Sequence, residues 1–142
     1  MPTRKANAVW TGKIKDGSGE IQLGSGHLRA PYSFASRFES GQGTNPEELI
    51  GAAEAGCFSM AFSLMLEQEG HPPEEIQSEA AVTIDQQGGG FAITKVEITM
   101  KARVPGIGED AFQRIAKQAK ENCPVSKALA GTTIELDATL ER

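Results

Sequence analysis

Cysteine, histidine and aromatic residues are scarce in this sequence, and each scarcity excludes a class of protein. Its 142 residues include two cysteines, Cys57 and Cys123, too few for a disulfide-stapled secreted scaffold. The two histidines, His27 and His71, lack the spacing of metal ligands, and neither Cys-x-x-Cys nor His-x-x-x-His occurs. We therefore expect no metal and no other cofactor. Aromatic residues make up 6% of the chain, which limits the core that a monomer can build.

Clustered positive charge is also missing, and the first residues do not have the pattern of a signal peptide. The net charge of −5 argues against a nucleic-acid partner, because phosphate binding needs grouped Lys and Arg. The segment Met1–Lys5 leads into no apolar core, so we expect no signal peptide and a cytoplasmic protein. In that reducing compartment, any pairing of the two cysteines is expected to be transient and chemical.

The one long apolar segment, residues 45–66, organises the chain. Asn45 is placed to cap a helix, Pro46 fits its first position, and Glu48 stands where a capping box needs it. From there to residue 66 the only charged residue is Glu54, and apolar residues occur on every side of the helix. This pattern predicts a core helix buried all round, and the internal Glu54 argues against a membrane partner.

Small residues recur every four positions along this helix, at Gly51, Ala55, Ser59 and Ser63. They leave one face nearly bare, which allows a second helix to approach closely. Since the rest of the chain has little apolar material to cover such a helix, we expect a homodimer.

The remaining pattern predicts an α+β fold with mostly antiparallel strands, in one domain of residues 1–142. Turn signals separate alternating or β-favouring runs from helical ones. Strands are expected at 5–14, 20–23, 32–34, 76–85, 91–104 and 132–140, and further helices at 109–122 and 123–130.

The two thiols are the first candidates for chemistry. The reactive form is the thiolate, and an ordinary cysteine has a pKa of roughly 8.5. Cys123 lies at a helix start, where N–H groups favour a thiolate, whereas Cys57 is in mid-helix and needs a cation brought by the fold. Two buried cysteines that only pack remain an alternative. Four nearby apolar residues are core material or the lining of a pocket beside Cys57, namely Phe58, Met60, Phe62 and Met65.

Several motifs resemble one family. They lie at residues 37–39, 43–53, 55–60 and 122–126, and they are similar to those of the osmotically inducible protein C (OsmC) group, which is related to the organic hydroperoxide resistance proteins. The resemblance runs nearly end to end. Two residues depart from it: Gly56 stands where alanine is usual, and Glu54 where histidine occurs in close relatives. We expect neither to touch the reacting residues, and Glu54 to alter the local field.

The resemblance implies a thiol peroxidase for oxidative and osmotic stress defence, built as an intertwined homodimer around long central helices. By motif position Cys57 is the peroxidatic cysteine, Cys123 the resolving one, and Arg37 and Glu47 the pair beside the reactive sulfur. The implied cycle forms a Cys57 sulfenic acid, then a Cys57–Cys123 disulfide, which an external dithiol reduces. The implied substrates are organic hydroperoxides and, more weakly, hydrogen peroxide, with no metal or haem.

Helix geometry adds a reason for a shared site. Glu47 and Cys57 are ten positions apart on one helix, which is roughly 15 Å along the axis and about 80° around it. The two cannot touch within one straight helix. If Arg37 and Glu47 both serve Cys57, either a second copy supplies one of them or the preceding loop folds far back, and the small-residue face fits the first option.

Two other functions are compatible with these residues. One is a non-catalytic binding module that holds an apolar ligand at the dimer interface. The other is a structural stress-response dimer with inert thiols. Peroxide consumption with a dithiol reductant separates both from a peroxidase.

Overall fold

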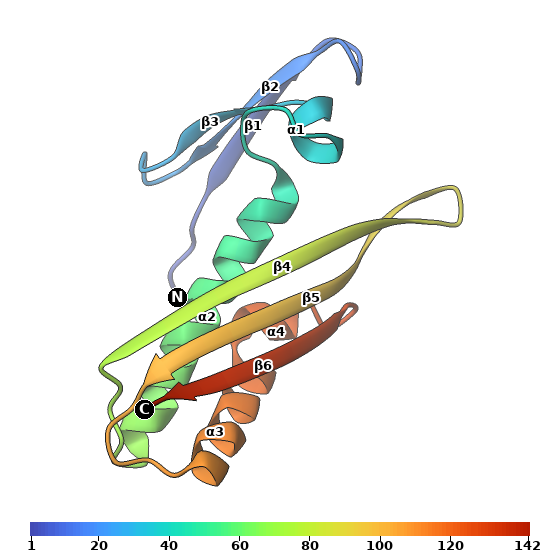
Figure 1. Cartoon of the computed structure of the whole chain (residues 1–142). Helices are drawn as coiled ribbons and strands as arrows, with labels where there is room; N and C mark the ends of the chain where they lie inside the picture. The colour runs from blue at the N-terminus through green and yellow to red at the C-terminus, as the bar shows by residue number, and fades with distance from the viewer. The chain divides into compact units, whose positions relative to one another are not determined.

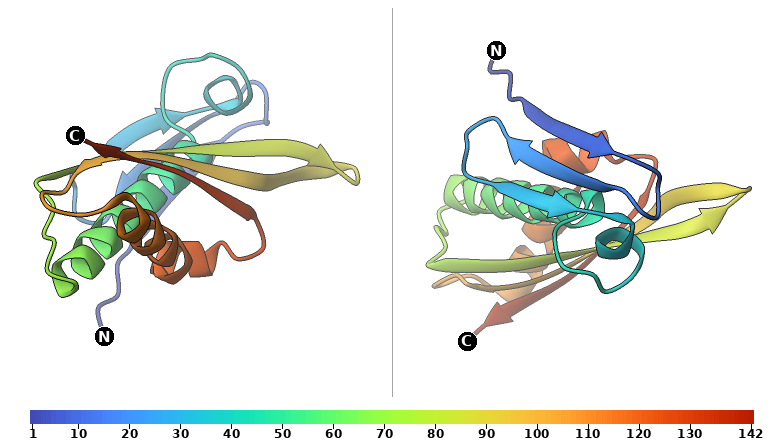
Figure 2. Two further views of the ribbon diagram at one scale, coloured as in Figure 1. Left: turned by 60° about the horizontal axis from the view of Figure 1, so that its bottom comes forward. Right: turned by 90° about the horizontal axis from the view of Figure 1, so that it is seen from above.

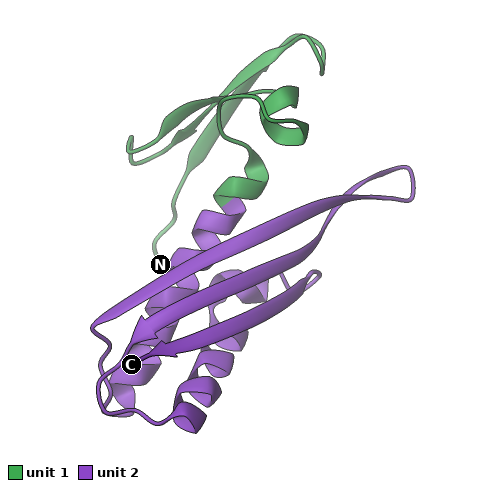
Figure 3. Cartoon of the chain, in the orientation of Figure 1, with its two compact units in different colours: residues 1–49 green, residues 50–142 purple.

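The computed structural model describes all 142 residues, which form two compact units. Unit 1 is Met1–Leu49 and unit 2 is Ile50–Arg142 (Figure 3). The long helix α2 (Pro46–Gln68) begins in unit 1 and continues through unit 2 without a break (Figure 1). Whether residues 1–142 act as one domain stays a prediction.

Unit 1 is a three-stranded antiparallel sheet followed by a short helix. The strands β1 (Ala6–Thr11), β2 (Ser18–Leu23) and β3 (Arg29–Tyr32) pair in chain order. The third strand, expected at residues 32–34, lies earlier and ends at Tyr32, and the helix α1 (Phe34–Phe38) stands where the strand was expected to continue. The reason is a capping box: the Ser36 N–H donates to the Ser33 hydroxyl at 3.1 Å, and the Ser33 N–H to the Ser36 hydroxyl at 2.8 Å.

Unit 2 contains a mixed sheet in the order β4 (Glu75–Gln87), β5 (Gly90–Arg103) and β6 (Thr133–Glu141). Strands β4 and β5 form an antiparallel hairpin. Its turn is Gly88-Gly89, both with positive φ, which matches the twist of the strands and which few other residues tolerate. Strand β6 runs parallel to β5, because the helices α3 (Glu109–Asn122) and α4 (Pro124–Ala128) carry the chain back between them.

One face of the unit 2 sheet is covered by helices, as Figures 1 and 2 show. Alternate residues of β5 turn their side chains toward these helices, and the intervening positions are polar or exposed. The core joins residues of α2 and α3 to the strands, and its fully buried members include Phe58, Phe62, Leu66, Val96, Ile98, Met100, Phe112 and Ile115. The α+β class and the amphipathic helix at 109–122 are thus confirmed.

Helix α2 differs from its expected environment. Phe58, Phe62 and Leu66 are fully buried, but Met60 is 76% and Leu64 55% exposed. The prediction of a helix buried all round is therefore wrong for the single chain, because the sheet and α3 cover only one side. By length and composition α2 is apolar enough to cross a membrane, and 28% of its most apolar 18-residue stretch is buried. Its packing on the sheet is that of a core helix with one open face.

The small residues of α2 contact a strand rather than a second helix. A Cβ added to Gly51 would lie 2.9 Å from the carbonyl oxygen of Ala80 in β4. About two helical turns further on, the Ser59 hydroxyl donates to that of Ser78 in β4 at 2.8 Å. The expected role of this face is corrected accordingly: its small side chains allow the backbone of β4 to approach.

A substitution of Phe62 measures how much the packing of α2 in the core contributes to stability. Its ring lies 5.8 Å from that of Phe58 and 5.4 Å from that of Phe112. We expect Phe62→Ala to lower the free energy of unfolding by about 3–5 kcal/mol, because a buried ring is replaced by a cavity. Urea denaturation at a single protein concentration measures the change.

The control for this substitution is Glu67→Ala, at an exposed position of the same helix. It is expected to change the free energy of unfolding by about 0.5 kcal/mol or less. Equal losses in the two variants would contradict the core described above.

Candidate active site

The fold of unit 2 brings the two cysteines together. Cys57 lies in the middle of α2 and is partly exposed, whereas Cys123 is fully buried at the junction of α3 and α4. The Cys57 thiol hydrogen-bonds with that of Cys123 and accepts a hydrogen bond from the backbone N–H of Val125. Two thiols in this arrangement are placed for the formation of a disulfide.

Local chemistry explains why Cys123 sits where it does. Its N–H donates to the carbonyl oxygen of Ala119 at 3.0 Å, which ends α3. Pro124 follows and suits the first position of α4, where no N–H is needed. Cys123 therefore ends one helix and begins the next, as the sequence predicts.

The environment within unit 2 raises the pKa of the Cys57 thiol. The largest cause is burial, followed by the hydrogen bond with Cys123; the charges of Cys123 and Glu54 add to the increase. The Val125 N–H acts in the opposite direction. No cationic side chain of this unit is among the causes, so the cation that the mid-helix position calls for is not supplied here.

Glu54 lies close to the thiol pair. It is fully buried one helical turn before Cys57, and its charge acts on that thiol. The expectation that it touches none of the reacting residues stays a prediction. The Oε1 of Glu54 accepts a hydrogen bond of 2.5 Å from the hydroxyl of Ser126 in α4, and its Oε2 has no hydrogen-bond partner. The expectation that Glu54 alters the local field is confirmed, since its charge raises the pKa of Cys57.

The sequence does not indicate that Ser126 and Val125 contribute to the site. Ser126 is a common small residue and Val125 acts through its backbone, so neither side chain signals chemistry. A signal for Glu54 was present: it is the only charge in an apolar helix, and it lies three residues before a cysteine.

Arg37 and Glu47 form a pair in unit 1. The guanidinium donates from Nε to Oε1 and from Nη2 to Oε2 of Glu47, each at 3.0 Å. The Glu47 residue is 7% exposed, and the guanidinium also stacks on the ring of Phe38 at 5.2 Å. This fork-to-fork geometry fixes the direction of the guanidinium.

The start of α2 leaves Glu47 free for that pairing. The Glu48 N–H donates to Oδ1 of Asn45 at 2.7 Å, which confirms the predicted cap. The Glu48 carboxylate, however, accepts from the Thr44 hydroxyl at 2.9 Å instead of completing the capping box. Three neighbouring polar residues are thus occupied with the cap, and Glu47 is not among them.

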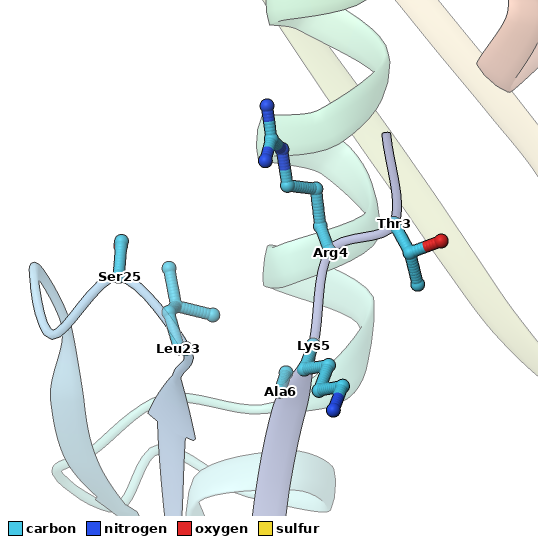
Figure 4. A pocket seen from close by; sticks show the side chains of 7 residues that line it. Thr3, Arg4, Lys5, Ala6, Leu23 and Ser25 are labelled. Carbon is cyan, nitrogen blue, oxygen red and sulfur yellow. The ribbon is translucent and has the colours of Figure 1, made fainter. Parts of the chain in front are cut away.

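Other parts of the chain offer less chemistry. A hollow of about 640 Å³ in unit 1 is lined by residues 3–6 and 23–25, and Figure 4 shows the side chains of Arg4 and Lys5 at its edge. It contains no thiol, carboxylate or imidazole. No group of three or more His, Cys, Asp or Glu residues gathers in the chain. The thiol pair with its Glu54 and Ser126 neighbours is therefore the candidate site.

Comparison with known proteins agrees with this choice. Residues 39–137 match the family model described as OsmC-like protein. Over 139 residues the chain is 48% identical to Peroxiredoxin OsmC of Escherichia coli, covering 97% of this chain and 96% of that protein. It is 31% identical, also over 139 residues, to the organic hydroperoxide resistance protein OhrB of Bacillus subtilis, covering 94% of this chain and 98% of that one.

The fold has solved counterparts as well. The crystal structure of an OsmC-like protein from Mycoplasma pneumoniae superposes with a TM-score of 0.77 at 15% identity, covering 99% of both chains. That likeness concerns the fold alone, whereas the family match and the sequence relatives extend over most of the chain. The chain belongs to the OsmC-like protein family.

Proposed function

We propose that this protein is a thiol-dependent peroxidase that reduces organic hydroperoxides. The observation that carries the proposal is the pair of adjacent thiols, Cys57 and Cys123, in a chain 48% identical to a protein named Peroxiredoxin OsmC. The relatives named for organic hydroperoxide resistance support the substrate class. Hydrogen peroxide is a weaker substrate in this proposal.

The cycle has three steps. The Cys57 thiolate attacks the terminal peroxide oxygen, the O–O bond breaks, the alkoxide takes up a proton from solvent and leaves as the alcohol, and a sulfenic acid remains. The Cys123 thiol then attacks that sulfur, forming the disulfide and releasing water. An external dithiol reduces the disulfide and is itself oxidised. Cys57 takes the first role because it is partly exposed, whereas Cys123 is fully buried.

Arg37 and Glu47 provide the charge that unit 2 lacks. An arginine stays protonated and its fork can hold both a thiolate and a peroxide oxygen. Glu47 fixes that fork through its two hydrogen bonds of 3.0 Å. In our proposal this pair stands beside Cys57 of the second copy in a homodimer, so each active site is shared between chains.

The open face of α2 supports a dimer. Four exposed residues, Ala53, Gly56, Met60 and Leu64, follow one stripe of the helix. An exposed apolar stripe on an otherwise packed helix is typical of an interface. The partners in this proposal are therefore a second copy of the chain, the hydroperoxide and the dithiol. We also propose a cytoplasmic location, because free thiols persist in that reducing compartment.

The first test separates the roles of the two cysteines. With cumene hydroperoxide and a dithiol reductant, Cys57→Ser is expected to lose all turnover, because the sulfur that attacks the peroxide is gone. Cys123→Ser is expected to react once and to retain a Cys57 sulfenic acid that dimedone traps. Mass spectrometry of the wild type after one equivalent of peroxide should show the loss of two hydrogens.

Equal peroxide consumption by the wild type and Cys57→Ser would refute the peroxidase. Binding of the hydroperoxide without consumption would favour the alternative of an apolar-ligand module. The double cysteine variant is the control, since it should show no mass change at all.

The second test concerns Arg37. We expect Arg37→Ala to lower the rate of Cys57 oxidation by about 100-fold or more, as for the loss of an electrostatic stabiliser aimed at the reacting atoms. The matched control is Arg29→Ala, which also removes an arginine of unit 1 that is paired with a glutamate, Glu20. Stopped-flow measurement of Cys57 oxidation is the readout, and equal rates for the two variants would remove Arg37 from the mechanism.

The third test asks whether the site is shared between chains. Arg37→Ala and Cys57→Ser chains are mixed and allowed to exchange subunits. If the site is shared, one of the two sites in each heterodimer is intact, and partial activity returns. Verified exchange without any recovery would contradict a shared site.

A further inference from the structure

The thiol pair has a polar neighbour that the peroxidase cycle does not use. On α2, Glu54 and Cys57 stand three residues apart, and on the segment opposite Cys123 and Ser126 do as well. Each residue of one pair contacts a residue of the other: Ser126 donates to Glu54 at 2.5 Å, and the thiols of Cys57 and Cys123 hydrogen-bond. The same two stretches of chain are therefore joined at two successive positions.

The contact between Glu54 and Ser126 helps to hold α4 on α2, because little of α4 is buried. The helix has five residues, and Ser126 is its only buried one. The Val125 N–H that reaches Cys57 and the Cys123 thiol belong to the same short segment. The hydrogen bond of Ser126 is thus one of the contacts that hold this segment on α2, beside those of Cys123 and Val125 with Cys57.

Glu54 is an unusual choice for a residue that only packs. A fully buried carboxylate with one oxygen lacking any partner is costly, and an apolar side chain in its place avoids that cost. Its charge also opposes ionisation of the thiol that must react. Exceptions of this kind are expected at functional sites.

We propose that Glu54 is a positioning residue of the thiol cycle, which through Ser126 holds the Cys123–Ser126 segment on α2 for resolution of the Cys57 sulfenic acid. The inference rests on the proposed function. In the step concerned, the Cys123 sulfur bonds to the Cys57 sulfur, the S–O bond of the sulfenic acid breaks, and the hydroxyl leaves as water with the proton of the Cys123 thiol.

The charge of Glu54 has a second, separable effect. The titratable groups that act on Cys57 within unit 2 are Cys123, at the start of α4, and Glu54, on α2 itself. Both raise the pKa of Cys57, so removal of the Glu54 charge lowers this pKa. Looser packing around Cys57 would also lower this pKa, because burial is the largest cause of its increase, so the titration is read together with the rate of disulfide formation.

Two substitutions separate the hydrogen bond from the charge. Glu54→Gln keeps an oxygen that accepts from Ser126 and removes the charge. We expect its disulfide to form at close to the wild-type rate, and its thiolate absorbance at 240 nm to rise at lower pH. Ser126→Ala keeps the charge and removes the donor, and we expect its disulfide to form about tenfold more slowly or worse, with more sulfenic acid trapped by dimedone.

Two further variants serve as controls. Ser126→Thr keeps a hydroxyl that can donate to Glu54, and its disulfide is expected to form at close to the wild-type rate. This variant keeps the test valid even if Ser126→Ala folds poorly. Ser59→Ala removes the hydroxyl bond that joins α2 to β4, and it is expected to leave both readouts unchanged.

The same variants are also oxidised with diamide, which forms the disulfide without a peroxide. If the wild type reacts with diamide but not with cumene hydroperoxide, the proposed peroxidase function is refuted. The positioning role is then judged from the rates of disulfide formation with diamide. Unchanged disulfide formation in Ser126→Ala with both oxidants would overturn the positioning role. An unmoved thiolate titration in Glu54→Gln would overturn the charge effect.

Discussion

The burial of one side of α2 against the sheet is the interaction on which unit 2 depends. Phe58, Phe62 and Leu66 recur every four residues and are fully buried, which fixes the rotation of the helix about its axis. That rotation decides what the other positions meet. Cys57 and Glu54 are brought to the α4 segment, and the small residues to β4. The chemistry of the site is thus a consequence of ordinary core packing.

The site is also defined by an electrostatic conflict. Burial, a second thiol and a carboxylate all raise the pKa of Cys57, and a single backbone N–H lowers it. A raised pKa reduces the share of the thiolate, which is the form that reacts. Activation then requires a cation, and the Arg37–Glu47 pair of unit 1 is oriented by two hydrogen bonds of 3.0 Å. A shared site in a dimer would make reactivity depend on assembly.

Local signals predicted most elements well and their surroundings less well. The helix at 109–122 and its buried face follow from a 3.6-residue period, and the long helix from its cap and following glycine. The helix α1 was missed because two serines that cap each other outweigh the β-favouring residues around them. The small-residue face and the burial of α2 were misjudged, since composition says that a face is small or apolar but not which element covers it.

The sequence by itself determined the fold class, the two cysteines and their motifs, and hence the family, because residue types at short spacings carry that information. Only the tertiary structure decided that the thiols of Cys57 and Cys123 meet and that the Val125 N–H donates to Cys57. It also decided that Ser126 donates to Glu54 beside these thiols. These contacts join α2 to a segment more than fifty residues away, and they depend on how both pack on one sheet. No local sequence pattern predicts contacts between segments so far apart in the chain, because these contacts are set by how the core packs between the two segments.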